Sequence, residues 1–349
     1  MLRYSEITGA FITNYTSGRT DEEMYGCAFG PDNNLYVTVN DVGDGAVLRY
    51  DGSTGAFLDQ FVPLRGGGLS APTALKFGPG GDLFVGSKLY TNSSLGPAWI
   101  GRVLRYDGTN GTFRGVFVAN GAGGLSCPFD LTFGPDGNLY VSDSFGTVVG
   151  GVGVLRFDGA SGAFLGTFIP RGSGGLTNAW GLAFGPDGNC YVSSFDTDSV
   201  LRYDGTNGTF IDAFVAAGRG GLSGPQALTF GPDGLLYACS SLTGAVIRYD
   251  GKSGSFIDVF IKPGGGGPGF DSRSILFTPR GPRLGIEHSS SGLLLRWPRA
   301  VGNFVVEARQ TMNPSNNWSQ LQMAPTLLGE DWAVTNSGTG NAGFFRLRR

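Results

Sequence analysis

Residues 179–215 read AWGLAFGPDGNCYVSSFDTDSVLRYDGTNGTFIDAFV, and this stretch decides the fold of the chain. Apolar and polar residues alternate in four short segments, which is the pattern of half-buried β-strands. Between the first two segments, Pro186 presets φ for a turn, Asp187 can bond its own backbone and Gly188 accepts a positive φ. The predicted strands of this antiparallel unit cover residues 179–184, 190–194, 200–203 and 209–215.

The same unit recurs along most of the chain. Its marker is Phe-Gly-Pro-Asp, which is complete at Phe29, Phe133, Phe184 and Phe230 and altered at Phe77 and Phe277. These phenylalanines are separated by 48, 56, 51, 46 and 47 residues, which is the length of a propeller blade. A lone unit would expose apolar side chains on both faces, whereas units stacked around an axis bury both. The sequence therefore predicts an all-β protein with a six-bladed β-propeller.

The composition agrees with many short strands and tight turns. The 349 residues include 62 Gly and 18 Pro, with 12% aromatic and 15% charged residues. A formal net charge of -3 gives no electrostatic reason to expect nucleic acid as a partner, and no apolar run is long enough for membrane insertion. The four cysteines show no CxxC spacing, so we expect buried thiols rather than a disulfide framework.

The chain ends carry incomplete repeats. Leu2-Arg3-Tyr4 matches the third-strand sequence LRY, and no first or second strand precedes it. Phe277 ends a first strand, and no clear LRYDG follows it. The simplest closure uses residues 2–15 as the outer strands of the last blade. We therefore predict a propeller over residues 1–281 and, where the pattern changes, a small β-sandwich-like module over 282–349. An alternative interpretation takes residues 294–297 as a third strand that completes blade six.

The pattern PxxLxFGPDGNLYVSD…VLRYDG closely resembles NHL-repeat propellers over residues 1–281. It is also similar to two enzyme families built on such repeats, the calcium-dependent gluconolactonase-like hydrolases and the virginiamycin-type streptogramin lyases. The C-terminal segment resembles β-modules of secreted bacterial proteins, which implies an extracellular, periplasmic or cell-surface location. No signal peptide is evident at Met1.

The resemblance implies functional residues four positions before each marker phenylalanine. The gluconolactonase-like enzymes place an Asn or Glu metal ligand there, and the lyases place a His. In this chain these positions hold Tyr25, Thr73, Phe129, Trp180, Gln226 and Arg273. Between Met24 and Gly281 there is no Glu and no His, so the usual general base near neutral pH is missing. We expect no catalytic residues and no cofactor, apart from a weak calcium site at Asp130 and Asp143.

Two other repeated residues are predicted to be structural. The aspartates of the two turn types, such as Asp187 and Asp204, are expected to cap turns through side-chain to backbone bonds. The arginines of the LRY strands, such as Arg202, are expected to pair between neighbouring blades.

Positions that differ between repeats are free to carry specificity. In a propeller, the mouth positions share one face with the connections between second and third strands. The residues that these connections add to the face are Asn40, Asp41, Lys88, Tyr90, Asp143, Phe145, Phe195 and Asp196. The predicted ligand-binding set is Tyr25, Thr73, Tyr90, Phe129, Trp180, Phe195, Gln226 and Arg273. An aromatic mouth with a few hydrogen-bonding groups suits a small ligand or a glycan, although the aromatics could simply plug the channel. A longer connection over 88–102 offers Trp99 as an anchor for a protein partner.

Three functions are compatible with these observations. The first is a non-enzymatic binding or scaffold protein that recognises a glycan, a peptide or a partner protein through the variable face. The second is a lactonase-, esterase- or lyase-like enzyme with a rearranged, calcium-dependent site. The third is a structural spacer without a ligand.

Overall fold

In a computed structural model of the protein, the regular elements of the described residues are β-strands and a few short 3-10 turns. The chain divides into two units, Met1–Thr278 and Pro279–Arg349, and the expected boundary between residues 281 and 282 falls slightly later. The structure describes residues 1–5, 8–14, 16, 23–41, 44–93, 96–144, 153–264 and 274–278, and seven short strand segments between 285 and 348.

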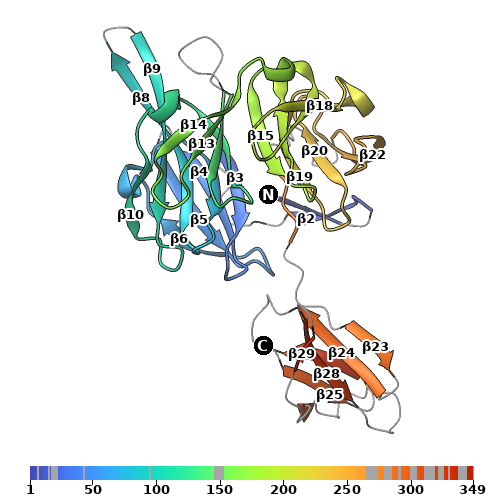
Figure 1. Ribbon diagram of the computed structural model, residues 1–349. Helices are drawn as coiled ribbons and strands as arrows, with labels where there is room; N and C mark the ends of the chain where they lie inside the picture. Colours follow the sequence, from blue (N-terminus) through green and yellow to red (C-terminus); the bar gives the residue numbers. More distant parts are fainter. Residues whose placement is uncertain are drawn as a thin grey trace. The chain divides into compact units, whose positions relative to one another are not determined.

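Five four-stranded antiparallel sheets form the blades of a β-propeller in the first unit (Figure 1). The first blade contains β3 (Glu23–Phe29), β4 (Leu35–Asp41), β5 (Asp44–Tyr50) and β6 (Phe57–Val62), and the second contains β7 (Pro72–Phe77), β8 (Leu83–Ser93), β9 (Gly96–Tyr106) and β10 (Phe113–Val118). The third contains β11 (Pro128–Phe133), β12 (Leu139–Asp143), β13 (Gly153–Phe157) and β14 (Phe164–Pro170), the fourth β15 (Ala179–Phe184), β16 (Cys190–Ser194), β17 (Ser199–Tyr203) and β18 (Phe210–Val215), and the fifth β19 (Pro225–Phe230), β20 (Leu236–Ser240), β21 (Ala245–Tyr249) and β22 (Phe256–Ile261). The four strands predicted between residues 179 and 215 are thus confirmed to within one residue at each end.

The marker phenylalanine joins neighbouring blades. Phe184 at the end of β15 packs edge-to-face on Tyr140 of the third blade, with ring centroids 5.0 Å apart. The equivalent pairs are Tyr36 with Phe77, Phe84 with Phe133, Tyr191 with Phe230, and Tyr237 with Phe277. Each of these tyrosines and Phe84 is at most 4% exposed, so the repeat spacing places one buried aromatic contact at each of these blade boundaries.

The glycine-rich loops form a second contact between blades. They contain the 3-10 turns η1 (Gly66–Gly68), η2 (Ala122–Gly124), η3 (Ser173–Gly175) and η5 (Arg219–Gly221). Gly220 has φ +70°, and a Cβ atom there would lie 2.2 Å from the Phe256 ring of the following blade. Tyr249 of that blade donates its hydroxyl to the Arg219 carbonyl at 2.7 Å. A loop without side-chain bulk is therefore required for the next blade to dock.

The turn aspartates have the predicted capping role. Asp187 accepts a hydrogen bond from the Asn189 amide at 3.1 Å and from the Tyr191 hydroxyl at 2.9 Å. Asp204 accepts from the Thr206 amide at 2.8 Å. The prediction that these aspartates cap turns is confirmed at these positions.

The repeated arginines pair within a blade, so the prediction that they join neighbouring blades is wrong. Arg202 on β17 donates from Nε to Asp212 on β18 of the same blade at 3.1 Å. The equivalent pairs are Arg49 with Asp59 and Arg248 with Asp258. The physical reason is the strand register, because Arg202 and Asp212 are direct partners across the β17–β18 ladder.

The segment predicted as a long connection in the second blade is a β-hairpin. Strands β8 and β9 stay paired out to Ser93 and Gly96, and Figure 1 shows them projecting beyond the other strands of the ring. Residues 88–102 read KLYTNSSLGPAWIGR and do not alternate between apolar and polar residues, so the strand pattern gave no signal that the ladder continues past the blade. The corresponding stretch of blade three, which includes Phe145, lies outside the described residues.

Two chain segments meet at the boundary between the fifth and first blades. Strands β1 (Leu2–Tyr4) and β2 (Phe11–Asn14) form an antiparallel pair. A Cβ atom on Gly9 of this hairpin would lie 2.0 Å from the Phe260 carbonyl oxygen, just as one on Gly254 would lie 1.8 Å from that of Phe214. The hairpin therefore contacts blade five in the way that blade five contacts blade four.

Residues 274–278 contact the blades on both sides of this boundary. Phe277 packs on Tyr237 of the fifth blade, with ring centroids 4.9 Å apart. On the other side, the Ser274 hydroxyl donates to the Tyr25 carbonyl of the first blade at 3.2 Å.

The second unit contains two antiparallel sheets. One has the order β23 (Gly285–Ser289), β24 (Gly292–Pro298), β28 (Asp331–Asn336) and β27 (Thr326–Leu328), and the other β26 (Ser319–Gln320), β25 (Val305–Arg309) and β29 (Phe344–Arg348). Because β24 is paired on one side with β23 and on the other with β28, it has no free edge for a propeller blade. The alternative that residues 294–297 complete blade six is therefore wrong.

Candidate functional site

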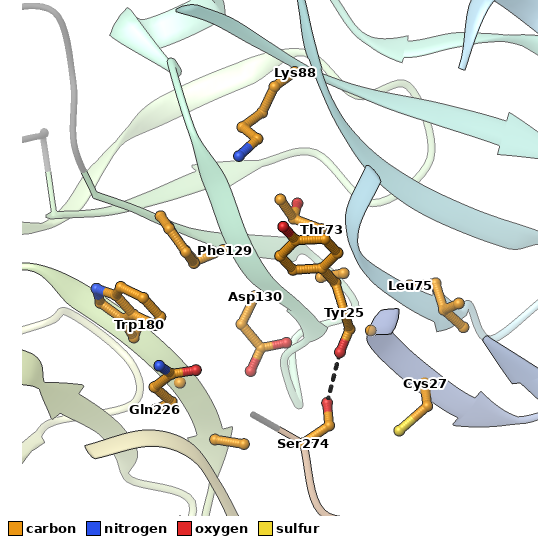
Figure 2. A pocket seen from close by; sticks show the side chains of 14 residues that line it. Tyr25, Cys27, Thr73, Leu75, Lys88, Phe129, Asp130, Trp180, Gln226 and Ser274 are labelled. Carbon is orange, nitrogen blue, oxygen red and sulfur yellow. Dashed lines mark hydrogen bonds between the residues drawn. The ribbon is translucent and has the colours of Figure 1, made fainter. Parts of the chain in front are cut away.

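The first strands of the blades converge on a cavity of about 310 Å³ (Figure 2). Its lining comes from β3, β7, β11, β15 and β19, which are the first strands of five blades, together with Lys88 of β8 and Ser274. Because each first strand enters the cavity at the same point of the repeat, the residues that meet there are far apart in the sequence. This volume lies at the lower end of the range for small-molecule sites.

Five of the eight predicted ligand-binding residues line this cavity. They are Tyr25, Thr73, Phe129, Trp180 and Gln226. Phe195 lies next to them, because its ring stacks on Trp180. Tyr90 lies on the β8–β9 hairpin and is 55% exposed, and it contacts Trp99 rather than the cavity. The last member, Arg273, lies outside the described residues.

An aromatic stack forms one wall of the cavity. The Phe129 and Trp180 rings are 4.2 Å apart with an interplanar angle of 26°, and the Trp180 and Phe195 rings are 4.7 Å apart at 17°. The indole of Trp180 is thus stacked against two other rings of the protein. The two stacks restrict the movement of the indole. A ligand in the cavity would therefore contact ring edges and polar groups rather than an open indole face.

One carboxylate enters the cavity. The residues directly after the mouth positions are Gly26, Ala74, Asp130, Gly181, Ala227 and Ser274, so five blades supply a small residue and one supplies Asp130. Its Oδ2 accepts from the Leu182 amide of the neighbouring blade at 3.0 Å, and its Oδ1 accepts from the Leu131 amide at 2.8 Å. Burial raises the pKa of Asp130, and the charge of Lys76 and these two amides only partly oppose that effect.

The other candidate metal ligand, Asp143, has a different position. It is buried, and its Oδ1 accepts from the Ser126 amide at 2.9 Å and from the Cys127 amide. The same place in other blades is held by Ser87, Ser194 and Ser240, which bind the corresponding loop residues Ser70, Thr177 and Ser223. Asp143 therefore holds, through hydrogen bonds, the loop that leads into its own blade. It is absent from the described lining of the cavity.

The described residues of the cavity do not fit a calcium ion. Ca²⁺ takes six to eight oxygen ligands, usually with several carboxylates. Asp130 is the one carboxylate among the described lining residues, so the several converging carboxylates of a calcium site are missing there. Across the described chain, no group of three or more His, Cys, Asp or Glu side chains could hold a metal ion.

Lys88 was predicted to share the variable face with the mouth residues but was left out of the ligand-binding set, and it lines the cavity. Its Nζ lies 5.8 Å from the centre of the Phe129 ring and 5.2 Å from that of Trp99. Lys88 comes one residue after the loop-fastening Ser87, at the place that Phe195 holds in blade four. This shared repeat position is the ground on which both Lys88 and Phe195 were assigned to the variable face.

Cys27 also lines the cavity, and burial raises the pKa of its thiol to about 11. The thiol form therefore predominates at neutral pH, which makes Cys27 a poor nucleophile. None of the four cysteines forms a disulfide.

No protein-family model matches the chain, and no curated protein sequence is significantly similar to it. Solved structures do show similarity. A nidogen/laminin complex has 18% identity and a TM-score of 0.52, covering 68% of this chain and 80% of that chain. The PQQ-bound aldose sugar dehydrogenase from Streptomyces coelicolor has 17% identity and a TM-score of 0.51, covering 97% of each chain. A gluconolactonase from Xanthomonas campestris has 17% identity and a TM-score of 0.48, covering 78% of this chain and 82% of that chain.

At these identities the similarity establishes the β-propeller fold and leaves the ligand open. In the described part of the chain, no helix has the length and apolar character that a bilayer crossing needs.

Proposed function

We propose that this protein is a non-enzymatic binding protein that takes up a small polar ligand at the mouth of the propeller channel. The observation that carries the proposal is the contrast around the cavity. The blades repeat one structure, yet each delivers a different side chain to the same space, for example Thr73, Trp180 and Gln226. A glycan end, a peptide end or a free small molecule fits this description, and the volume favours a single residue-sized group.

The rigid aromatic wall supports binding. Because Trp180 is stacked on both Phe129 and Phe195, little side-chain freedom is lost when a ligand arrives. The alternative is that these rings only fill the channel and bind nothing. The cavity that remains beside them favours binding over that alternative.

The second candidate is an enzyme of the lactonase, esterase or lyase type. A specific observation favours it: Asp130 is a carboxylate with a raised pKa inside a cavity, which is a property of general acids. The similar solved structures include an aldose sugar dehydrogenase and a nidogen/laminin complex, so the fold is compatible with both candidates. The missing partner groups lead us to prefer binding, since Asp130 has no His or Glu beside it among the described lining residues.

The test compares two tryptophan substitutions. Ser274 is exposed and lines the cavity, so Ser274→Trp should fill the space. Because the substitution also removes the hydrogen bond from Ser274 to the Tyr25 carbonyl, the melting temperature of each variant is measured first. Ala160→Trp places the same ring on an exposed turn of blade three and serves as the matched control. Thermal-shift and calorimetric screens would use neutral monosaccharides, amino acids and short peptides, alongside ester and lactone turnover assays.

We expect at least one probe class to bind the wild type and the Ala160→Trp variant, and to lose about tenfold or more in affinity for Ser274→Trp. Turnover of an ester or lactone that disappears in Ser274→Trp would replace the binding proposal with the enzyme. Equal behaviour of all three proteins toward every probe would reject the cavity as the functional site.

We also infer that the ring has six blades, of the NHL-repeat kind, with the last blade built from both chain ends. The contacts of Gly9 with blade five, and of residues 274–278 with blades five and one, support this closure. We keep the boundary near residue 281 and a β-sandwich arrangement of the two C-terminal sheets as parts of the same proposal. The resemblance of the C-terminal module to those of secreted bacterial proteins supports a location outside the cytoplasm, which cell fractionation of the native protein would test.

A further inference from the structure

Two opposite charges line the cavity without pairing with each other. Lys88 comes from β8 of the second blade and Asp130 from β11 of the third. In Figure 2 the Lys88 ammonium lies beside Phe129, while the Asp130 carboxylate points toward Gln226 and Ser274. No ion pair joins Lys88 to Asp130, and neither has another ion-pair partner among the residues that the structure describes.

The carboxylate still has capacity for a ligand. An ionised carboxylate offers about four acceptor sites, and backbone amides of Leu131 and Leu182 occupy two of them. Burying a carboxylate without a direct ion pair is costly, and the charge of Lys76 only partly offsets this cost at Asp130. The five small residues at the equivalent positions of the other blades show that the ring does not need a carboxylate there. A cationic group on a ligand would supply the missing charge.

The ammonium has complementary capacity. Lys88 is partly buried, and its side chain contacts the Cys127 thiol and the faces of Phe129 and Trp99, none of which carries a negative charge at neutral pH. These aromatic faces hold the ammonium near the cavity without neutralising its charge. An anionic group on a ligand could therefore form a charge-assisted hydrogen bond with it.

We propose that the cavity binds a small zwitterion of the amino-acid type, with its cationic group at Asp130 and its anionic group near Lys88. This inference rests on the proposed function and specifies its ligand class. A neutral sugar of the same size would leave both charges unpaired, so it should bind more weakly than a zwitterion with the matching separation of charges. The ring edges of Phe129 and Trp180 border the uncharged middle of the ligand.

The experiment measures the separation of charges directly. Isothermal titration calorimetry with the full chain would use glycine, β-alanine, 4-aminobutyrate, 5-aminovalerate and 6-aminohexanoate, which differ only in the number of methylenes between the ammonium and the carboxylate. Glucose serves as the neutral probe, and butylamine and butyrate carry one charge each. We expect one chain length to bind at least about tenfold more tightly than its neighbours two methylenes away, and more tightly than glucose.

Two substitutions test the orientation of the ligand. Asp130→Asn and Lys88→Met should each weaken the best zwitterion by about tenfold or more, since each removes a charge-assisted hydrogen bond. Asp130→Asn should also weaken butylamine but leave butyrate unchanged, and Lys88→Met should do the reverse. A general loss of structure cannot produce that crossed pattern, and Lys88→Met preserves the test if Asp130→Asn does not fold.

The outcomes separate this inference from the proposed function. If glucose binds in a manner that Ser274→Trp abolishes, while no member of the amino-acid series binds, the zwitterion inference is overturned and the proposed function stands. If the series binds but neither charge substitution changes its affinity, the inference is also overturned. If no probe of any class distinguishes the wild type from Ser274→Trp, both fail.

Discussion

On β15, Phe184 packs against Tyr140 of the preceding blade, whereas Trp180, four residues earlier on the same strand, lines the cavity. The same division holds on β19, where Phe230 packs on the preceding blade and Gln226 lines the cavity. The boundary position is phenylalanine in all six repeats, and no two repeats share a residue at the mouth position.

The difference shows that the fold restricts the side chain at the blade boundaries and leaves it variable at the channel mouth. A blade boundary must bury a ring of fixed size against a tyrosine and a glycine loop, so one residue type recurs there. At the channel mouth the contacts between blades differ from one boundary to the next, for example the Phe129–Trp180 stack between blades three and four and the hydrogen bond from Thr73 to the Pro128 carbonyl between blades two and three. Aromatic, polar and charged side chains therefore all occur there. Substitutions at the two kinds of position should therefore differ in their consequences for stability.

The largest effect is expected from removal of residues 1–15. The β1–β2 hairpin contacts blade five through Gly9 and through Tyr4, which packs on the cluster around Tyr237. Its loss would expose that boundary, and we expect the melting temperature to fall by roughly 10 °C or more. An unchanged melting temperature in calorimetry would refute the closure of the ring by the N-terminal segment.

A large effect is also expected at alkaline pH. Burial raises the pKa of Tyr36, Tyr140 and Tyr191 to about 12. Above pH 10 the unfolded chain loses these protons while the folded state retains them, so stability falls as pH rises from about 10 to 12. Each tyrosine contributes on the order of 1–3 kcal/mol to this loss.

Thermal unfolding between pH 8 and 11.5 measures this decline. The variant Tyr140→Phe has one titrating group fewer at a blade boundary, so its melting temperature should fall less steeply with pH than that of the wild type. Parallel curves for the two proteins would contradict the assignment of the decline to the boundary tyrosines.

An intermediate effect is expected within one glycine loop. Gly218 and Gly220 have nearly the same backbone, with φ of +67° and +70°, but a Cβ atom meets nothing within 4 Å at Gly218 and lies 2.2 Å from the Phe256 ring at Gly220. Gly218→Ala should cost about 1–2 kcal/mol of backbone strain. Gly220→Ala should cost roughly 1–3 kcal/mol more, because Phe256 must move. Equal losses in urea unfolding would mean that the loop does not hold the next blade in place.

The smallest effect is expected from two aspartates whose pKa values are shifted in opposite directions. Burial raises the pKa of Asp130, so its folded state holds the proton more firmly and stability falls as pH rises through the window between about 3.8 and that raised value. At Asp187, desolvation is outweighed by hydrogen bonds from Asn189 and Tyr191, which lower the pKa, so its contribution to stability is lost as pH falls. Near Asp130 the charged or titratable groups are Lys76, Lys88, Cys27 and Tyr25, and none of these types ordinarily titrates in this acidic window.

The measurement is the difference in unfolding free energy between each Asn variant and the wild type from pH 3.5 to 7. Asp130→Asn should gain relative to the wild type as pH rises, and Asp187→Asn should lose. The same trend in both variants would show that Asp130 titrates like the turn residue Asp187, and it would remove the contrast between the two regions.

Much of the ring could be predicted from local sequence. The strands over residues 179–215 follow from alternation, and the role of Asp187 follows from turn chemistry, because both depend on residues within a few positions. The partners of Arg202 could not be found in this way, because repetition alone does not distinguish a partner within the blade from one in the next blade. The hairpin of β8 and β9 was misread because a long interruption of the repeat was taken for a loop.

The sequence by itself determined the repeat, the blades and the positions that vary among them. Only the tertiary structure decided which varied residues meet, placing Asp130, Trp180 and Lys88 at one cavity and assigning Asp143 to a loop. The physical reason is the range of the interactions. Strands and turns are set by neighbours along the chain, while the contents of the channel are set by first strands about one blade length apart, which come together only when the ring closes.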